Sequence, residues 1–209
     1  MDYSFSITGL LKEAFDRSYG VKGTIVGASL IYGIVAVIIS AILELVFPSG
    51  DSFFNGIIQT LISAPITVPI MVGVTFLGIN HARGLDINIP SIFDYFGMMV
   101  PIITTFILMY ICLIIGFTLL ILPGIYLAVS YTFAYQLVAD KGLGAWEAME
   151  LSRKTVTKQW FKFFGLGLLS ALIIILSIIP LGIGLIWSIP TVYIAYGLLY
   201  HHIFDDEEV

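Results

Sequence analysis

Six apolar segments, each about as long as a membrane-spanning helix, occupy most of this 209-residue chain. A helix needs about 20 apolar residues to cross the hydrocarbon core of a bilayer. Hydrophobic residues make up 59% of the sequence and charged residues only 11%, which is far from the composition of soluble domains. We therefore predict an all-α, polytopic transmembrane six-helix bundle with spans at about 24–47, 52–79, 98–121, 124–139, 160–179 and 183–204.

The distribution of basic residues orients the six predicted spans. All nine Lys and Arg residues lie before the first span, in the connection that contains Arg83, or around the fourth connection, and the other three connections carry none. Because basic loops are retained on the cytoplasmic side, we predict a multi-pass protein of the bacterial inner membrane with both termini in the cytoplasm. The chain starts with acidic Asp2 in place of a basic segment, so we expect no cleaved signal peptide.

Short amphipathic stretches precede three pairs of spans, at residues 8–19, 90–97 and 144–160. Each has an apolar and a polar face, which is typical of helices that lie in the cytoplasmic membrane interface. Each stretch leads into an aromatic–glycine pair, namely Tyr19-Gly20, Phe96-Gly97 and Phe164-Gly165. The pattern predicts a single membrane domain (1–209) of three helical-hairpin repeats, with units at about 8–80, 88–140 and 143–204. Residues 205–209 form an acidic cytoplasmic tail in this interpretation.

One region of the chain resembles a known family. Residues 122–126 (Leu-Pro-Gly-Ile-Tyr), 140–144 (Asp-Lys-Gly-Leu-Gly) and 147–152 (Glu-Ala-Met-Glu-Leu-Ser) resemble the signature of YciC-like, uncharacterised bacterial six-helix membrane proteins. The family is related to a membrane domain fused to some glycerophosphodiester phosphodiesterases. The resemblance implies the six-helix topology and a lipid-related setting. It supplies no catalytic residue, and the predicted spans leave no stretch for a phosphodiesterase domain.

A polar stripe on the second span is the main candidate site. Asn55, Gln59, Ser63 and Thr67 recur every fourth residue, and Pro65 and Pro69 predict a break in the same helix. A polar stripe cannot face lipid without partners, so it either bonds to neighbouring helices or lines a wet groove. A ligand-binding groove would open outward, with Glu44 at its mouth. Tyr126 and Tyr193 occupy equivalent repeat positions and are candidates for the bundle interior, where a buried phenol needs a partner.

The same sequence excludes several classes of function. No Asp, Glu, His or Lys lies near the centre of a predicted span, which argues against an ion-coupled pump. No catalytic motif is present, and the histidines His81, His201 and His202 lack the spacing of a zinc site, so we expect no metal and no cofactor. A net charge of −5 without a basic stripe argues against a nucleic-acid partner.

We therefore expect a non-enzymatic protein that binds or moves a lipid or another amphipathic small molecule through the groove. Its expected partners are membrane lipids and such a molecule, with other membrane proteins or a second copy as further candidates. A structural or regulatory component that acts through contacts with other membrane proteins is the alternative. A lipid-acting enzyme at the cytoplasmic surface, using Glu147, Glu150 or the histidines, is the third interpretation.

Overall fold

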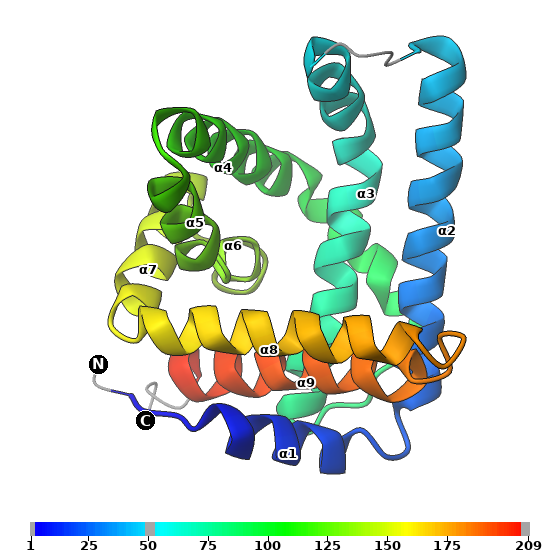
Figure 1. Ribbon diagram of the computed structural model, residues 1–209, viewed down its shortest axis with the longest axis vertical. Helices are drawn as coiled ribbons and strands as arrows, with labels where there is room; N and C mark the ends of the chain where they lie inside the picture. The colour runs from blue at the N-terminus through cyan, green and yellow to red at the C-terminus, as the bar shows by residue number, and fades with distance from the viewer. Residues whose placement is uncertain (1–2, 49–52, 206–209) are drawn as a thin grey trace.

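The computed structural model (Figure 1) describes residues 3–48 and 53–205, and every regular element in these ranges is a helix. This confirms the all-α prediction. The elements are α1 (Ile7–Arg17), α2 (Lys22–Val46), α3 (Phe53–Ala82), the 3-10 helix η1 (Ile89–Met98), α4 (Met99–Leu119), α5 (Ile121–Ser130), α6 (Ala134–Lys141), α7 (Ala145–Thr157), α8 (Trp160–Ile178) and α9 (Leu185–Phe204).

Five stretches in the described ranges are helical, long and apolar enough to cross a membrane, which indicates a multi-pass membrane protein. They are Lys22–Val46, Phe54–Ala82, Ile89–Leu119, Ile121–Lys141 and Trp160–Ile178. They correspond to the first five predicted spans. The expected sixth span, α9, is not among them. About half of its residues are buried, and its last turns carry Tyr200, His201 and His202.

The helices from α2 to α9, apart from η1 and α7, form three hairpins, which we number by chain order: α2 with α3, α4 with α5 and α6, and α8 with α9. In Figure 1 the first hairpin rises from the body of the protein, whereas α8 and α9 run across its base, so the hairpins splay. The amphipathic helices fill the angles between them. Helix α1 packs on α9, η1 packs on α3, and α7 packs on α5 and α6.

The helix break lies in the fourth predicted span, where the sequence did not indicate it. Helix α3 is continuous from Phe53 to Ala82 with Pro65 and Pro69 inside it, so the predicted break in the second span is wrong. Prolines are tolerated in membrane helices when neighbouring groups satisfy the freed backbone. The predicted fourth span instead divides into α5 and α6, separated by residues 131–133.

A serine from α7 satisfies the backbone at this break. The hydroxyl of Ser152 is buried, donates to the carbonyl oxygen of Ser130 (2.8 Å) and accepts from the N–H of Phe133 (3.2 Å). The two groups are those that lose their helical partners where α5 ends and α6 begins. The interruption between α5 and α6 is therefore stable, because α7 covers it. The Phe133 ring is buried in the core.

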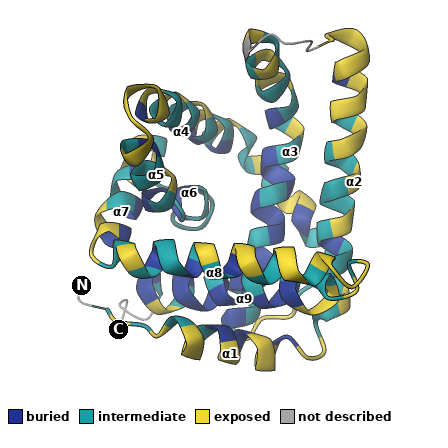
Figure 2. Ribbon diagram, viewed as in Figure 1, coloured by how far each residue is buried: buried dark blue, intermediate teal, exposed yellow. Residues whose placement is uncertain are grey.

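The first and third hairpins meet where two glycines face each other. A methyl group on Gly197 of α9 would overlap the carbonyl oxygen of Gly78, and one on Gly78 of α3 would overlap the carbonyl oxygen of Tyr193. The two backbones are thus in direct contact, as in other membrane helix pairs with small residues at the crossing. Most of the buried apolar side chains lie on these two helices and the elements packed against them (Figure 2).

We predict that Gly197→Ala destabilises the protein by about 1–3 kcal/mol, because the added methyl group forces α3 and α9 apart. Gly33→Ala is the matched control, since a methyl group there meets no atom within 4 Å. It should be neutral or stabilise α2 by up to about 1 kcal/mol. Thermal unfolding in detergent measures both. Equal unfolding temperatures for the two variants would contradict the close contact between α3 and α9.

Candidate functional site

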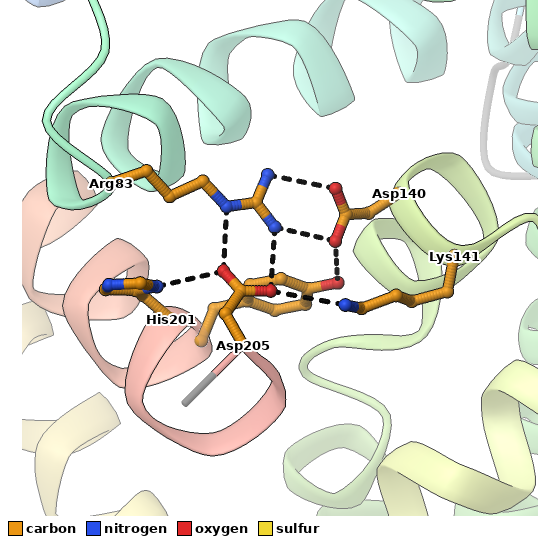
Figure 3. A network of polar contacts seen from close by, with 6 residues as sticks. Arg83, Asp140, Lys141, His201 and Asp205 are labelled. Atoms are coloured by element: carbon orange, nitrogen blue, oxygen red, sulfur yellow. Dashed lines mark hydrogen bonds and ion pairs between the residues drawn. The ribbon is translucent and has the colours of Figure 1, made fainter. Parts of the chain in front are cut away.

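The second arms of all three hairpins end at one ionic cluster, formed by Arg83, Asp140, Lys141, Tyr200, His201 and Asp205 (Figure 3). Arg83 directly follows α3, Asp140 and Lys141 close α6, and Asp205 directly follows α9. Tyr200 and His201 come from the last turns of α9. The cluster therefore joins three segments that are far apart in the sequence.

The guanidinium of Arg83 lies between two carboxylates and donates to both oxygens of each. Its bonds to Asp140 are 2.9 Å from Nη1 and 2.7 Å from Nη2, and its bonds to Asp205 are 2.7 Å from Nε and 3.0 Å from Nη2. Four of the five N–H groups of the guanidinium are engaged in this way. Paired bonds of this kind combine strength with a fixed orientation.

The two carboxylates have further partners. The hydroxyl of Tyr200 donates to Oδ2 of Asp140 (2.8 Å), and the ammonium of Lys141 donates to Oδ1 of Asp205 (3.3 Å). Nδ1 of His201 lies 3.0 Å from Oδ2 of Asp205. Two cations, Arg83 and Lys141, thus face the two carboxylates of Asp140 and Asp205.

Ion pairing fixes the charge state of the cluster. Partial burial opposes ionisation of Asp205, but hydrogen bonds from Arg83 and His201 outweigh it and lower the pKa of this carboxyl to about 2. Burial alone would lower the pKa of Arg83, yet its bonds to Asp140 and Asp205 raise that pKa above its ordinary value. Asp205 ionises below its unfolded pKa of about 3.9. Its contribution to stability is therefore present above that pH and is lost only as the pH falls toward about 2.

Glycines end two of the helices where the charged side chains are needed. Gly84 has φ +74° and closes α3, with its N–H bonded to the carbonyl of His81 and the N–H of Leu85 bonded to that of Asn80. Gly142 has φ +66° and closes α6. Left-handed glycines are the usual helix stop. Arg83 and Lys141 thereby stand at helix C-termini, where the helix dipole favours cations.

A cavity of about 370 Å³ lies next to the cluster, between the hairpins. We call it the inter-hairpin cavity. Its wall includes residues of α2, α3, α6, α8 and α9, among them Ser29, Thr75, Gln136, Ile174, Ile189 and Tyr193. The lining is mainly apolar, with hydroxyl and amide groups at a few positions and no charged side chain.

The cavity and the cluster are successive layers of the same three helices. Each helix places one residue in the cavity wall and the residue four positions further on, one helical turn away, in the cluster. The cavity residues are Ile79, Gln136 and Tyr196, and their partners one turn on are Arg83, Asp140 and Tyr200. The ionic cluster therefore lies one helical turn beyond this part of the cavity wall.

Gln136 has an unused hydrogen-bond acceptor beside the cavity that its side chain lines. Its Nε2 lies 3.4 Å from Oγ1 of Thr75, whereas its Oε1 is buried and has no hydrogen-bond partner. A buried carbonyl without a partner costs about 1–3 kcal/mol. A ligand in the cavity would recover this energy by donating a hydrogen bond to Oε1 once the amide turns toward it. The arrangement suits an apolar molecule with a small uncharged donor group.

The predicted groove residues lie in separate places. At the outer end of the first hairpin, Nε2 of Gln59 donates to Oε2 of Glu44 (3.0 Å) and to the carbonyl of Phe47 (2.8 Å). Nδ2 of Asn55 donates to the carbonyl of Pro48 (3.0 Å). These three side chains thus join α2 to α3, as in the interhelical alternative of the sequence analysis. Glu44 and Gln59 also border a shallow surface hollow of about 540 Å³.

The other members of the stripe bond within their own helix. Oγ of Ser63 donates to the carbonyl of Thr60, and Oγ1 of Thr67 donates to the carbonyl of Ser63, both at 3.0 Å. Neither side chain borders the inter-hairpin cavity. The residues of α3 that do are Thr75, two turns beyond Thr67, and Ile79, one turn further on.

The two candidate tyrosines have different surroundings. Tyr193 lines the inter-hairpin cavity, as expected for an interior phenol. Tyr126 lies between α5, α7 and α8, where its hydroxyl is 2.8 Å from Oγ1 of Thr157 and its ring stacks on Trp160. Tyr126 has a polar partner, but the contact is exposed, so this tyrosine is not the buried interior phenol that was predicted and does not border the cavity.

A separate, polar hollow of about 510 Å³ lies between α1 and the ends of α3 and α9. We call it the basal hollow. Glu13, Arg17, His201 and His202 are among its lining residues. Arg17 pairs with Glu13 at 2.7 Å. Within residues 3–48 and 53–205, no group of three or more His, Cys, Asp or Glu side chains has a geometry that could hold a metal ion.

Comparisons with protein-family models, with curated proteins and with solved structures give no match to this chain. The resemblance to YciC-like membrane proteins therefore stays a prediction.

The ionic cluster is the part of the site that the sequence analysis missed. Asp205 was assigned to a solvated tail, whereas it is held by Arg83; residues 206–209 lie outside the described residues. One signal was available, because Arg83 is the only basic residue of its connection and stands directly before Gly84. Its partners are 57 and 122 residues away and show no local pattern.

We predict that Arg83→Gln lowers the free energy of unfolding by about 3 kcal/mol, because two partly buried carboxylates lose their shared cation. Arg17→Gln is the control. The side chains of Arg17 and Glu13 are 46% and 50% exposed, and such a pair contributes about 1 kcal/mol or less. Unfolding in detergent at neutral pH and constant salt compares them. Similar losses in both variants would contradict an anchoring role for Arg83.

Proposed function

We propose that this protein is a non-enzymatic, multi-pass protein of the inner membrane that binds a lipid or another amphipathic small molecule in the inter-hairpin cavity. The observation that carries the proposal is the buried, unpartnered Oε1 of Gln136 at a mainly apolar cavity of about 370 Å³. Ligand pockets in proteins are of about this size or larger, with apolar walls and few polar groups.

The charge distribution favours an uncharged polar group on the ligand. The nearest charges are those of the ionic cluster, and they are already paired with one another. A charged head group in the cavity would find no counter-ion and would have to be desolvated at high cost. A hydroxyl or amide group can donate to Gln136 while an apolar body contacts Ile174, Ile189 and Val192.

We also propose that the three hairpins are repeats about a pseudo-threefold axis, with both chain termini in the cytoplasm. Each amphipathic helix packs on the second arm of the preceding hairpin, and α1 closes the ring by packing on α9. All three second arms end at the ionic cluster. This cyclic pattern supports the three repeat units that the aromatic–glycine pairs predict. Arg83 and Lys141 both contact Asp205, so these three residues would lie on the same side of the membrane.

Native mass spectrometry of the protein in mild detergent, with identification of retained lipids and metabolites, tests the binding proposal. We expect a retained ligand that is lost from Gln136→Leu, which removes the acceptor, and from Val192→Phe, which fills the cavity. Val37→Phe is the matched control, because Val37 is exposed on α2 and should leave retention unchanged. Asn55→Leu/Gln59→Leu should also retain the ligand, since these side chains lie at the tip of the first hairpin.

An empty protein, or a ligand retained by both cavity variants, would contradict the proposal. Loss from Asn55→Leu/Gln59→Leu but not from Val192→Phe would move the site to the groove of the first hairpin. An empty protein whose stability Val192→Phe increases would favour a structural component that acts through contacts with other membrane proteins.

A lipid-acting enzyme is the second candidate, and the basal hollow is the observation that favours it. Glu13, His201 and His202 could supply a general acid and base there. However, Glu13 is paired with Arg17 and His201 with Asp205. Incubation with lipid distinguishes the candidates, because an enzyme would convert the lipid with turnover that His202→Ala abolishes, whereas a binder returns it unchanged.

A further inference from the structure

Helix α1 lies along the third hairpin from its base to its tip. At the base, the rings of Tyr3 and Phe5 pack on Phe163 near the start of α8, with centroids 6.4 and 5.4 Å apart. Near the tip, Lys12 and Phe15 border the same surface hollow as Ser177 and Gly184. Figure 1 shows α1, α8 and α9 running side by side across the base of the protein.

The outward face of α1 is charged along its second half. Lys12, Glu13, Asp16 and Arg17 are exposed, whereas Leu11, Ala14 and Ser18 are buried against the protein. Each charged side chain at the centre of a bilayer costs about 3 kcal/mol or more. Helix α1 therefore cannot lie within the hydrocarbon core, and a hairpin that it follows from base to tip cannot cross that core either.

A cation from the first basic segment reaches the tip of the third hairpin. The ammonium of Lys22 lies 3.8 Å from the ring centroid of Tyr19 and 5.4 Å from that of Trp187. Trp187 belongs to the first turn of α9, just after the connection at 179–184. The tip of the hairpin is thus on the same side of the membrane as Lys22.

We propose that the third hairpin does not cross the membrane but lies with α1 in the cytoplasmic interface, where its outer apolar face contacts the acyl chains of the cytoplasmic leaflet. The six-span prediction instead puts the connection at 180–182, between the fifth and sixth spans, on the outer side of the membrane. Helix α9, which is not apolar enough for a span by itself, is then the covered inner layer of the hairpin. The lipid-facing side chains are those exposed on α8, namely Phe161, Leu168, Leu172, Ile175, Leu176 and Ile178.

We take lipid, rather than a second protein chain, to cover this apolar face, because basic and aromatic side chains border it as they do in helices of the membrane interface. Lys12 on α1 and Lys22 on α2, together with Lys162 on α8, border the apolar face. Interfacial helices combine basic and aromatic residues at head-group level with an apolar face directed to the acyl chains. Trp187, Tyr19 and Phe15 supply the aromatic residues here.

Cysteine accessibility tests the proposal on the full chain in its membrane. In a Cys112→Ala background, which has no other thiol, Leu181→Cys puts a probe on the tip of the third hairpin, where Leu181 is 94% exposed. Phe47→Cys marks the outer end of the first hairpin, and Leu85→Cys marks the cytoplasmic connection after Arg83. A membrane-impermeant maleimide is applied to intact spheroplasts and to inverted vesicles.

We expect Leu181→Cys to react in inverted vesicles at a rate within about threefold of Leu85→Cys, and to stay unlabelled in spheroplasts, where Phe47→Cys reacts. Ile183→Cys is a second probe, should the first variant fail to insert. Labelling of either tip probe in spheroplasts would mean that the hairpin crosses the membrane and would overturn the proposal. A thiol that reacts in detergent but from neither side of the membrane would overturn it as well, because the tip would then lie in the acyl layer.

Discussion

The guanidinium of Arg83 binds two carboxylates from other hairpins, and this interaction determines where the three hairpins converge. Asp140 and Asp205 belong to different second arms, so one side chain connects the ends of α3, α6 and α9. Taking these charges out of water is costly unless all of them are paired with good geometry. The pairing is complete for Arg83, since four bonds of 2.7–3.0 Å orient it.

The other main features follow from this convergence. Gly78 and Gly197 allow α3 and α9 to touch, whereas α6 is joined to the end of α3 through Arg83 and is spaced from α9 by the buried Phe133 ring. A space is left between the three second arms and α8, and it becomes the inter-hairpin cavity. Ser152 of α7 stabilises the break that lets α6 turn toward the cluster.

Local patterns were sufficient to place the helices but not the site. The expected segments at 8–19, 24–47 and 160–179 agree with α1, α2 and α8 to within two residues at each end, because apolar runs and glycine stops act locally. The break in the fourth span was missed because its cause is a distant serine, not a proline in the same helix. Of the seven candidate ligand residues, Tyr193 alone lines the inter-hairpin cavity. The stripe from Asn55 to Thr67 has the correct helical period, but hydrogen bonds to α2 or to its own backbone satisfy it.

Hydrogen exchange of Asp140→Asn in lipid nanodiscs tests most directly whether one ionic cluster holds all three hairpins together. The carboxylate of Asp140 accepts hydrogen bonds from Arg83, just after α3, and from Tyr200 on α9. Its replacement should therefore also destabilise the ends of α3 and α9. The account predicts faster exchange at the ends of α3, α6 and α9 together, with no change at the outer ends of α2 and α4. Faster exchange confined to α6 would contradict it, because the hairpins would then hold their positions independently of the cluster.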